Sequence, residues 1–319
     1  TRTDVNVSNQ GDSQRESTIA VNPANSNNII ASANDLNAVD GIFGSSSSND
    51  SVWVSTDGGN TWARKLIPLP AGAVGSHGDP SIVFSRDGSR AVYVHMVDKN
   101  AAHTHVMASA VSLDGGNTWL QANTGVIGSL ALDEDGDGIN DDNDKEFIAV
   151  GPDVTDPSRD RYAVTWQRGG VIYASTSLDG LVWSTPVIVG GVNGTTGTGT
   201  APRVPAGTSI DAIPAFGSNG EIYVAWEDYS TPGVSRVMFD LSLDGGLTWG
   251  GGRDAKVFFN TADFALDATD RTALDAFAAM LTANPQLVVT VAGFTDTEGT
   301  QADNLTLSAN RAQAVANYL

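Results

Sequence analysis

Residues 55–62 read STDGGNTW, and the same pattern returns along the chain. Residues 112–119 read SLDGGNTW, residues 242–249 read SLDGGLTW, and a shorter copy, SLDGLVW, occupies residues 177–183. The copies begin roughly 60 residues apart, a period typical of repeated supersecondary units. We therefore expect one structural unit for each copy.

An apolar, β-branched run precedes each copy, and two more short runs stand further upstream. The four preceding runs are SVWV (51–54), VMASAV (106–111), VIYAST (171–176) and RVMFDL (236–241). Short apolar runs at even spacing, separated by turn signals, predict antiparallel sheets of about four strands each. In each copy we expect the aspartate to accept backbone hydrogen bonds, the glycine to adopt positive φ and the tryptophan to fold onto the sheet edge. We therefore interpret the repeat as a structural turn and not as a catalytic motif.

The pattern S-x-D-x-G-x-T-W resembles the Asp-box (BNR) repeat of the sialidase-like β-propellers, over roughly residues 1–250. The resemblance implies a mainly β fold, an Asp-box β-propeller with about four visible blades, to which we assign residues 1–252. Such propellers usually carry six or seven blades. The ring is therefore four-bladed, lacks blades, or contains blades without the motif. The family includes sialidases, other glycan-active enzymes and proteins that only bind, so the resemblance leaves the activity open.

The sialidase site is poorly represented. Those enzymes use three arginines for the substrate carboxylate, a Tyr/Glu nucleophile pair and an acidic proton donor. The Arg-Ile-Pro tripeptide that normally holds the first arginine does not occur, and Arg15–Glu16 is its nearest positional analogue. Glu221, Glu227 and Tyr229 match only by residue type. A sialidase-like exo-glycosidase is therefore the alternative, and we assign no catalytic residue.

An acidic loop, DEDGDGINDDND, occupies residues 133–144. Its spacing matches a calcium-loop template in which carboxylates and one backbone carbonyl surround the ion and a glycine makes the sharp turn. The expected Ca²⁺ ligands are Asp133, Asp135, Asp137, the carbonyl of Ile139, Asp141 and Asp144. The loop resembles the thrombospondin type 3 and dockerin calcium loops. The alternative is a solvated acidic loop.

The four histidines all fall within a short stretch, at positions 77, 95, 103 and 105. If residues 103–105 form a strand, His103 and His105 lie on one face. With His95 across a hairpin they form a hypothetical zinc site. The alternative is ordinary exposed or hydrogen-bonded imidazoles.

A different kind of sequence begins near residue 253. AKVFFN (255–260) and QLVVTVAGF (286–294) predict strands. Between them, a helix begins at the N-cap Asp267, with its apolar face at Leu274, Phe277, Ala278 and Leu281. SANRAQAVANYL (308–319) predicts a second helix with Ser308 as its cap. Residues 253–319 thus predict a β-α-β-α segment.

The end of this segment, GFTDTEGTQADNLTLSANRAQAVANYL, resembles the core of the OmpA-like peptidoglycan-binding domain. The matching positions are Gly293, Thr295, Asp296, Gly299, Asn304, Leu307, Ser308, Arg311, Ala312 and Val315. The resemblance implies that Asp296 and Arg311 bind the zwitterionic diaminopimelate of peptidoglycan, and that Asn304 orders the loop or contacts the ligand. The family's usual histidine is Phe294 here, and the family continues beyond Leu319 with another strand and helix. We therefore expect an incomplete α+β OmpA-like segment.

Composition limits the partners. The chain has 37 acidic and 17 basic residues and a formal net charge of −20, which argues against nucleic acid. It has no cysteine, so disulfides and thiol chemistry are excluded. Abundant glycine and scarce lysine are common in exported bacterial proteins. We expect an exported, non-enzymatic cell-envelope protein, tethered to peptidoglycan, whose propeller displays a surface for a glycan or protein; a self-assembling surface subunit is a further alternative.

Overall fold

A computed structural model describes the chain in segments. They are residues 4–9, 14–35, 51–98, 105–121, 126–127, 143–189, 209–231, 234–249, 259–283, 291, 293–295 and 298–319. The chain divides into two compact units, Thr1–Gly250 and Gly251–Leu319, which are described separately below.

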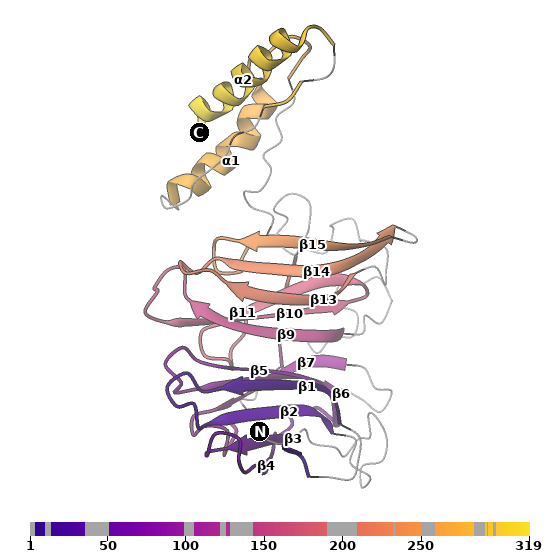
Figure 1. Cartoon of the computed structure of the whole chain (residues 1–319), viewed down its shortest axis with the longest axis vertical. Coiled ribbons are helices and arrows are strands. Elements are labelled where there is room, and N and C mark those ends of the chain that lie inside the picture. The colour runs from indigo at the N-terminus through magenta and orange to yellow at the C-terminus, as the bar shows by residue number, and fades with distance from the viewer. Residues whose placement is uncertain are drawn as a thin grey trace. The chain divides into compact units, whose positions relative to one another are not determined.

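Four antiparallel sheets make up the first unit (Figure 1). The first sheet contains β1 (Gln14–Val21), β2 (Ile29–Asp35), β3 (Ser51–Ser55) and β4 (Ala63–Leu66). The second contains β5 (Gly75–Phe84), β6 (Ala91–Asp98), β7 (His105–Ser112) and β8 (Val126–Ile127). The third contains β9 (Asn143–Pro152), β10 (Asp160–Arg168), β11 (Val171–Ser177) and β12 (Val187–Ile188), and the fourth β13 (Ser209–Phe216), β14 (Ile222–Thr231) and β15 (Val234–Ser242). Each sheet is a simple meander, so the prediction of a mainly β fold with one blade-like sheet per repeat is confirmed.

Three apolar cores hold the sheets face to face. Ile30 and Val54 of the first sheet pack with Tyr93 of the second. The second and third sheets share a core around Val94 and Trp166, and further clusters continue to the fourth sheet. Figure 1 shows the sheet β1–β4 at one end of the row and the sheet β13–β15 at the other.

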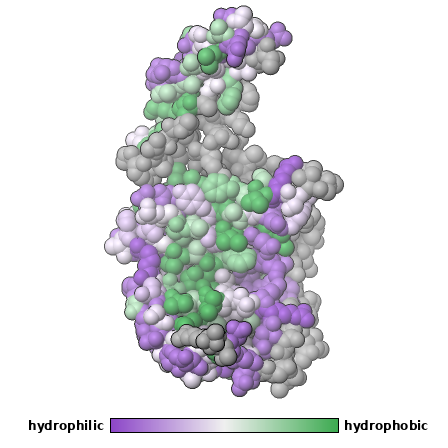
Figure 2. All heavy atoms as spheres, in the orientation of Figure 1, coloured by the Kyte–Doolittle hydropathy of each residue, from purple (hydrophilic) through white to green (hydrophobic). Residues whose placement is uncertain are grey.

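The two end sheets keep exposed apolar side chains. Ile19 and Val21 of β1 are 63% and 51% exposed, and Val237 of β15 is 80% exposed. Figure 2 shows apolar side chains gathered along the middle of the visible face of this unit. These exposed residues differ from the apolar residues of the cores between sheets, which are buried.

The repeated octapeptides form turns at one edge of the sheets. In the first copy the Asp57 carboxylate accepts hydrogen bonds from the Thr61 backbone N–H at 2.9 Å and the Thr61 hydroxyl at 2.6 Å. The Ser55 hydroxyl accepts the backbone N–H of Gly59, whose φ is 87°. The indole N–H of Trp62 donates to the carbonyl of Gly59. Equivalent aspartate and serine bonds recur around Asp114, Asp179 and Asp244, so the expected structural role of the turn is confirmed.

The second unit contains α1 (Ala268–Ala283) and α2 (Gln301–Tyr318). Asp267 caps α1 as expected, since its carboxylate accepts the N–H of Asp270 at 2.8 Å and the Asp270 carboxylate accepts the N–H of Asp267. Leu274 is fully buried, whereas the side chain of Phe277 lies outside the described residues. The expected start of the second helix at Ser308 is wrong. The cap lies eight positions earlier, at Thr300, which accepts the N–H of Asp303.

Residues 255–258 and most of 286–294 lie outside the described residues, so the two strands expected there stay predictions.

Candidate functional site

The first strand of each sheet, which we call the inner strand, has the same backbone irregularity. It lies near the start of the strand, at the end of the sheets opposite the repeated turns. In β1, β5, β9 and β13 the register with the neighbouring strand shifts near the strand start. At each shift one non-glycine residue has positive φ: Glu16 at 52°, Asp79 at 49°, Lys145 at 56° and Asp211 at 55°. Such backbone is costly for residues with a Cβ and persists where the surrounding structure enforces it, often at functional sites.

Three of these residues meet and form what we call the inner-strand cluster: Glu16, Asp79 and Lys145. The Lys145 ammonium contacts the Glu16 carboxylate and lies 2.9 Å from Oδ2 of Asp79. Asn34 of β2 donates its side-chain N–H to Glu16 at 2.6 Å and to Asp79 at 2.7 Å. The bulges thus turn charged side chains from three different sheets toward one point.

The pKa values of the two carboxyl groups shift in opposite directions. A hydrogen bond with Asp79, together with burial, raises the pKa of Glu16. Burial alone would raise the pKa of Asp79, but hydrogen bonds from Glu16, Asn34 and Lys145 lower it. Burial opposes the charge on Lys145, yet its hydrogen bonds and the charges of both acids raise its pKa, so the ammonium stays charged at neutral pH.

This geometry suits recognition better than hydrolysis. Glycosidases that use two carboxyl groups hold them about 5 Å apart or more, leaving room for the sugar or a water. One Asn34 nitrogen donates to both Glu16 and Asp79, and the Lys145 ammonium contacts both, so these two groups fill the space that a sugar or a water would need. A carboxyl pair with one ammonium offers donors and acceptors to a polar ligand such as a hydroxyl-rich glycan.

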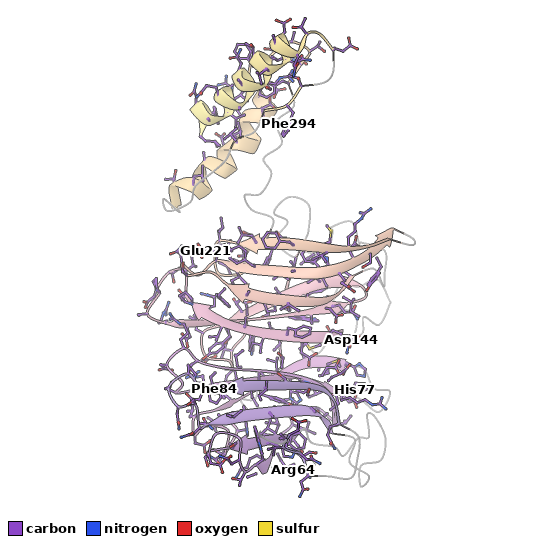
Figure 3. The ribbon with its side chains drawn as sticks, in the orientation of Figure 1. Arg64, His77, Phe84, Asp144, Glu221 and Phe294 are labelled. Atoms are coloured by element: carbon purple, nitrogen blue, oxygen red, sulfur yellow. The ribbon has the colours of Figure 1, made fainter. Side chains whose placement is uncertain are left out.

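The three residues that match a sialidase by type lie at opposite ends of the strands. Tyr229 donates its hydroxyl hydrogen to the Glu227 carboxylate on β14, at the edge opposite the turns. This bond raises the pKa of Tyr229. Glu221 lies at the turn edge instead, where it accepts hydrogen bonds from Asn219 (Figure 3).

Three arginine side chains are held by hydrogen bonds at the turn edge. Arg86 bonds Asp160, Arg90 bonds the carbonyl of Asp179, and Arg161 bonds Asp153. These three side chains cannot form a carboxylate clamp at the opposite edge.

Of the expected calcium ligands, only Asp144 is described. Asp133, Asp135, Asp137, Ile139 and Asp141 lie outside the described residues. Asp144 is half-buried near the start of β9, toward the same end of the strands as His77 (Figure 3). Burial and the charge of Asp79 raise the pKa of Asp144.

In the second unit the guanidinium of Arg311 is held by three backbone carbonyls. It donates to Asp263 at 2.9 Å, to Phe294 at 2.9 Å and to Asn260 at 3.0 Å. Asn304 lies in the first turn of α2. Asp296 is outside the described residues, although Phe294 precedes it by only two positions.

Sequence reasoning missed the inner-strand cluster, although a signal was present. The starts of the inner strands align as RESTIAV (15–21), GDPSIVF (78–84), DKEFIAV (144–150) and IDAIPAF (210–216). Each has a charged residue at its second position, and these positions recur at roughly the interval of the turn motif. The alignment gives the residues, but the bulge that brings them together is a property of the folded sheet.

Comparison with known proteins identifies a family for the C-terminal segment. Residues 258–319 match the model of the OmpA family. The C-terminal segment is an OmpA family domain. The OmpA domain implies peptidoglycan binding and an association with the cell envelope. Among the described helices, neither α1 nor α2 has the length and apolar character needed to cross a membrane.

Several solved structures resemble part of the chain. An α-L-arabinanase of Penicillium chrysogenum is 12% identical, with a TM-score of 0.46, over 72% of this chain and 64% of its own. An α-L-arabinofuranosidase of Fusarium graminearum is 14% identical, with a TM-score of 0.43, over 72% of this chain and 63% of its own. A Trypanosoma rangeli sialidase is 16% identical, with a TM-score of 0.41, over 74% of this chain and 37% of its own.

At such identities the likeness gives no information about the activity of this chain. The chain spans less than two thirds of the length of each of these three proteins. A search of curated proteins found no match.

Proposed function

We propose that this chain is a non-enzymatic protein of the bacterial cell envelope. Its OmpA domain binds peptidoglycan, and its four-sheet unit presents a polar surface to a glycan or protein. The observation that carries the proposal is the position of Arg311, a motif residue of the OmpA domain, beside the segment that leads to Asp296.

Recognition of diaminopimelate needs charges of both signs. Its ammonium group pairs with a carboxylate, for which we propose Asp296, and its carboxylate pairs with a guanidinium, for which we propose Arg311. Three of the five guanidinium N–H groups of Arg311 donate to the carbonyls described above, which fixes the orientation of the remaining two. A guanidinium held in this way loses little conformational freedom on binding.

The proposed ligand surface of the four-sheet unit is centred on the inner-strand cluster. Three features support this choice: the backbone of the cluster is strained, its side chains carry charges of both signs, and its residues come from three different sheets. We also propose that the acidic loop at 133–144 binds Ca²⁺ and orders the chain that enters β9 at Asn143. The position of Asp144, half-buried near the negative charge of Asp79, supports a nearby cation.

One observation favours the enzymatic alternative, a sialidase-like exo-glycosidase. Tyr229 and Glu227 form the hydrogen-bonded pair that such an enzyme uses as nucleophile and base. The hydrogen bonds that hold three arginines at the turn edge count against it.

Co-sedimentation with purified diaminopimelate-type peptidoglycan tests the tether. The intact chain is expected to pellet, and free diaminopimelate is expected to release it. Asp296→Asn keeps the side-chain shape but removes the charge, and is expected to leave the chain in solution. Gln313→Ala, on the exposed part of α2, is the matched control and is expected to pellet normally.

Because Arg311 also holds backbone carbonyls, loss of binding in Arg311→Ala counts only if circular dichroism shows intact helices. Lysine-type peptidoglycan, which lacks the second carboxylate, is expected to bind weakly. Equal pelleting of the parent and Asp296→Asn would overturn the assignment.

A further inference from the structure

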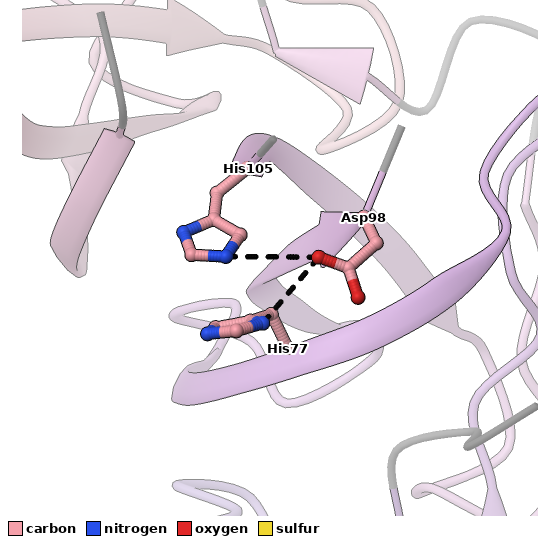
Figure 4. Close-up of side chains that lie close together, drawn as sticks. All are labelled: His77, Asp98 and His105. Atoms are coloured by element: carbon pink, nitrogen blue, oxygen red, sulfur yellow. Dashed lines mark ion pairs between the residues drawn. The ribbon is translucent and has the colours of Figure 1, made fainter. Parts of the chain in front are cut away.

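Two histidines and one aspartate meet at one end of the strands of the second sheet. Asp98 ends β6 and His105 begins β7, and the two are register partners. His77 lies in β5, where the register shifts between Ser76 and Gly78. The shift marks a bulge, which re-aims a side chain that regular pleating would place elsewhere. Figure 4 shows Nδ1 of His77 and Nε2 of His105 facing one oxygen of Asp98.

The distances fit coordination better than hydrogen bonding. Asp98 Oδ1 is 3.4 Å from His77 Nδ1 and 3.6 Å from His105 Nε2, and the three ligand atoms lie within 4.8 Å of one another. Hydrogen bonds between nitrogen and oxygen are typically about 2.7–3.2 Å long. Ligands placed tetrahedrally about 2.1 Å from a zinc ion stand about 3.4 Å apart.

The protonation that metal binding requires also suits this arrangement. The two imidazole rings are tilted against each other, with their centroids 3.5 Å apart and an angle of 35° between them. Two imidazolium ions at this distance would repel each other, whereas metal ligation needs both rings neutral. The Asp98 side chain is fully buried, while each histidine side chain is 14% exposed, which leaves access for an ion from solvent.

The backbone around the three residues is held on several sides. The side chain of Asn143 donates to the carbonyl of His105 at 2.8 Å, and the indole N–H of Trp166 donates to Asn143 at 2.7 Å. The carbonyl of Asp98 accepts the N–H of Val74 at 2.7 Å. Such support fixes ligand positions before the ion arrives.

We propose that His77, Asp98 and His105 bind one divalent transition-metal ion, with Zn²⁺ as the favoured ion. Two imidazoles and one carboxylate are a donor set that zinc accepts, and three protein ligands leave the fourth position to water. The site differs from the hypothetical trio of His95, His103 and His105. His95 is fully buried and pairs with the hydroxyl of Ser76 through Nδ1, and His103 lies outside the described residues.

Metal binding to the whole chain tests the proposal. The chain is stripped with a chelator, dialysed and titrated with Zn²⁺ by calorimetry, and with Co²⁺ by visible absorption. We expect one strong Zn²⁺ per chain and cobalt bands of the intensity that a four-coordinate site produces. His77→Gln, His105→Gln and Asp98→Asn are each expected to weaken Zn²⁺ binding by at least about tenfold.

Control variants separate this site from the other candidates. His95→Gln and His103→Gln remove the other two histidines and are expected to leave the cobalt spectrum unchanged. Asp135→Asn, in the acidic loop, is expected to leave it unchanged too, as is excess Ca²⁺. The proposal is overturned if the parent binds no Zn²⁺ stoichiometrically, or if binding survives in a folded double variant, His77→Gln with His105→Gln.

Discussion

The side chain of Asn28, on the first sheet, donates a hydrogen bond to the carbonyl of Gly115, on the second, at 2.9 Å. Gly115 belongs to the second copy of the repeated turn, so the turn is held by the preceding sheet as well as by its own aspartate. Between the third and fourth sheets, the hydroxyl of Thr176 donates to the carbonyl of Gly245 at 3.1 Å. The repeat therefore makes hydrogen bonds to the neighbouring sheet as well as forming a hairpin turn.

Replacing Gly115 with alanine is expected to destabilise the four-sheet unit strongly. Its φ is 72°, and a Cβ there would approach Oδ1 of Asn28 to 2.8 Å. The left-handed backbone costs an alanine about 1–2 kcal/mol, and disturbing the Asn28 hydrogen bond adds about 1 kcal/mol. Urea unfolding measures the total.

Gly72→Ala is the matched control, because φ is 90° there and nothing lies within 4 Å of the added Cβ. It is expected to lose only the backbone contribution. Equal losses in the two variants would show that the contact between sheets contributes nothing.

Acid is expected to destabilise the four-sheet unit through its turn aspartates. Hydrogen bonds from the Thr61 side chain and backbone, and from Ser55, lower the pKa of Asp57 from 3.8 to about 2. Burial opposes ionisation of Asp153, but bonds from Thr155 and the charge of Arg161 lower its pKa to about 2 as well. Because both pKa values fall on folding, these groups stabilise the fold fully above about pH 4, and this stability is lost as the pH falls toward 2.

Urea midpoints measured at several pH values between 7 and 2 check this. Asp57→Asn is expected to flatten the acid limb, whereas Asp4→Asn, at an exposed position outside the sheets, is not. An unchanged acid limb in Asp57→Asn would contradict the assignment of the effect to this turn.

The two edges of the sheets differ in how far sequence could predict them. The structure of the repeated turn depends on local contacts. Serine, aspartate, glycine and threonine within eight residues make nearly all of its hydrogen bonds, so the octapeptide sequence alone predicts the turn. The opposite edge is assembled from residues far apart in sequence. Glu16 and Lys145 are 129 positions apart, and His77 enters its cluster only because a bulge turns it there. The start of α2 was missed for a local reason, since Thr300 and Ser308 are both good caps and only the folded chain shows which one is used.

Removing the ammonium from the inner-strand cluster is expected to destabilise the fold by about 1–2 kcal/mol at neutral pH, in Lys145→Met. Glu16 and Asp79 would then face each other without a cation. Lowering the pH protonates one carboxyl and is expected to recover part of the loss. Thermal unfolding at pH 7 and pH 5 measures both effects, and Lys65→Met on β4 is the control. A loss that is identical at both pH values would point to packing and not to charge.

Chelation is expected to destabilise the first unit if the loop at 133–144 binds Ca²⁺. Removing calcium leaves many carboxylates close together, which favours an open loop and weakens the entry to β9. Thermal unfolding in the presence of a calcium-selective chelator, then with calcium restored, measures the effect. Asp137→Asn is expected to remove most of the calcium response, whereas Asp156→Asn, in the exposed turn after β9, is expected to keep it. Identical unfolding with and without calcium in the parent would contradict calcium binding by the loop.

No turnover of an aryl sialoside is expected from this chain. A sialidase needs arginines that bind the substrate carboxylate, but Arg86, Arg90 and Arg161 are held by hydrogen bonds at the turn edge, away from Tyr229 and Glu227. Fluorescence release from the substrate, followed over hours at pH 5 to 8, measures this. Glu221→Gln is the control, because Glu221 lies at the turn edge, away from the pair. Turnover in the parent and in Glu221→Gln, lost in both Glu227→Gln and Tyr229→Phe, would establish the sialidase alternative and overturn the non-enzymatic role proposed for the four-sheet unit.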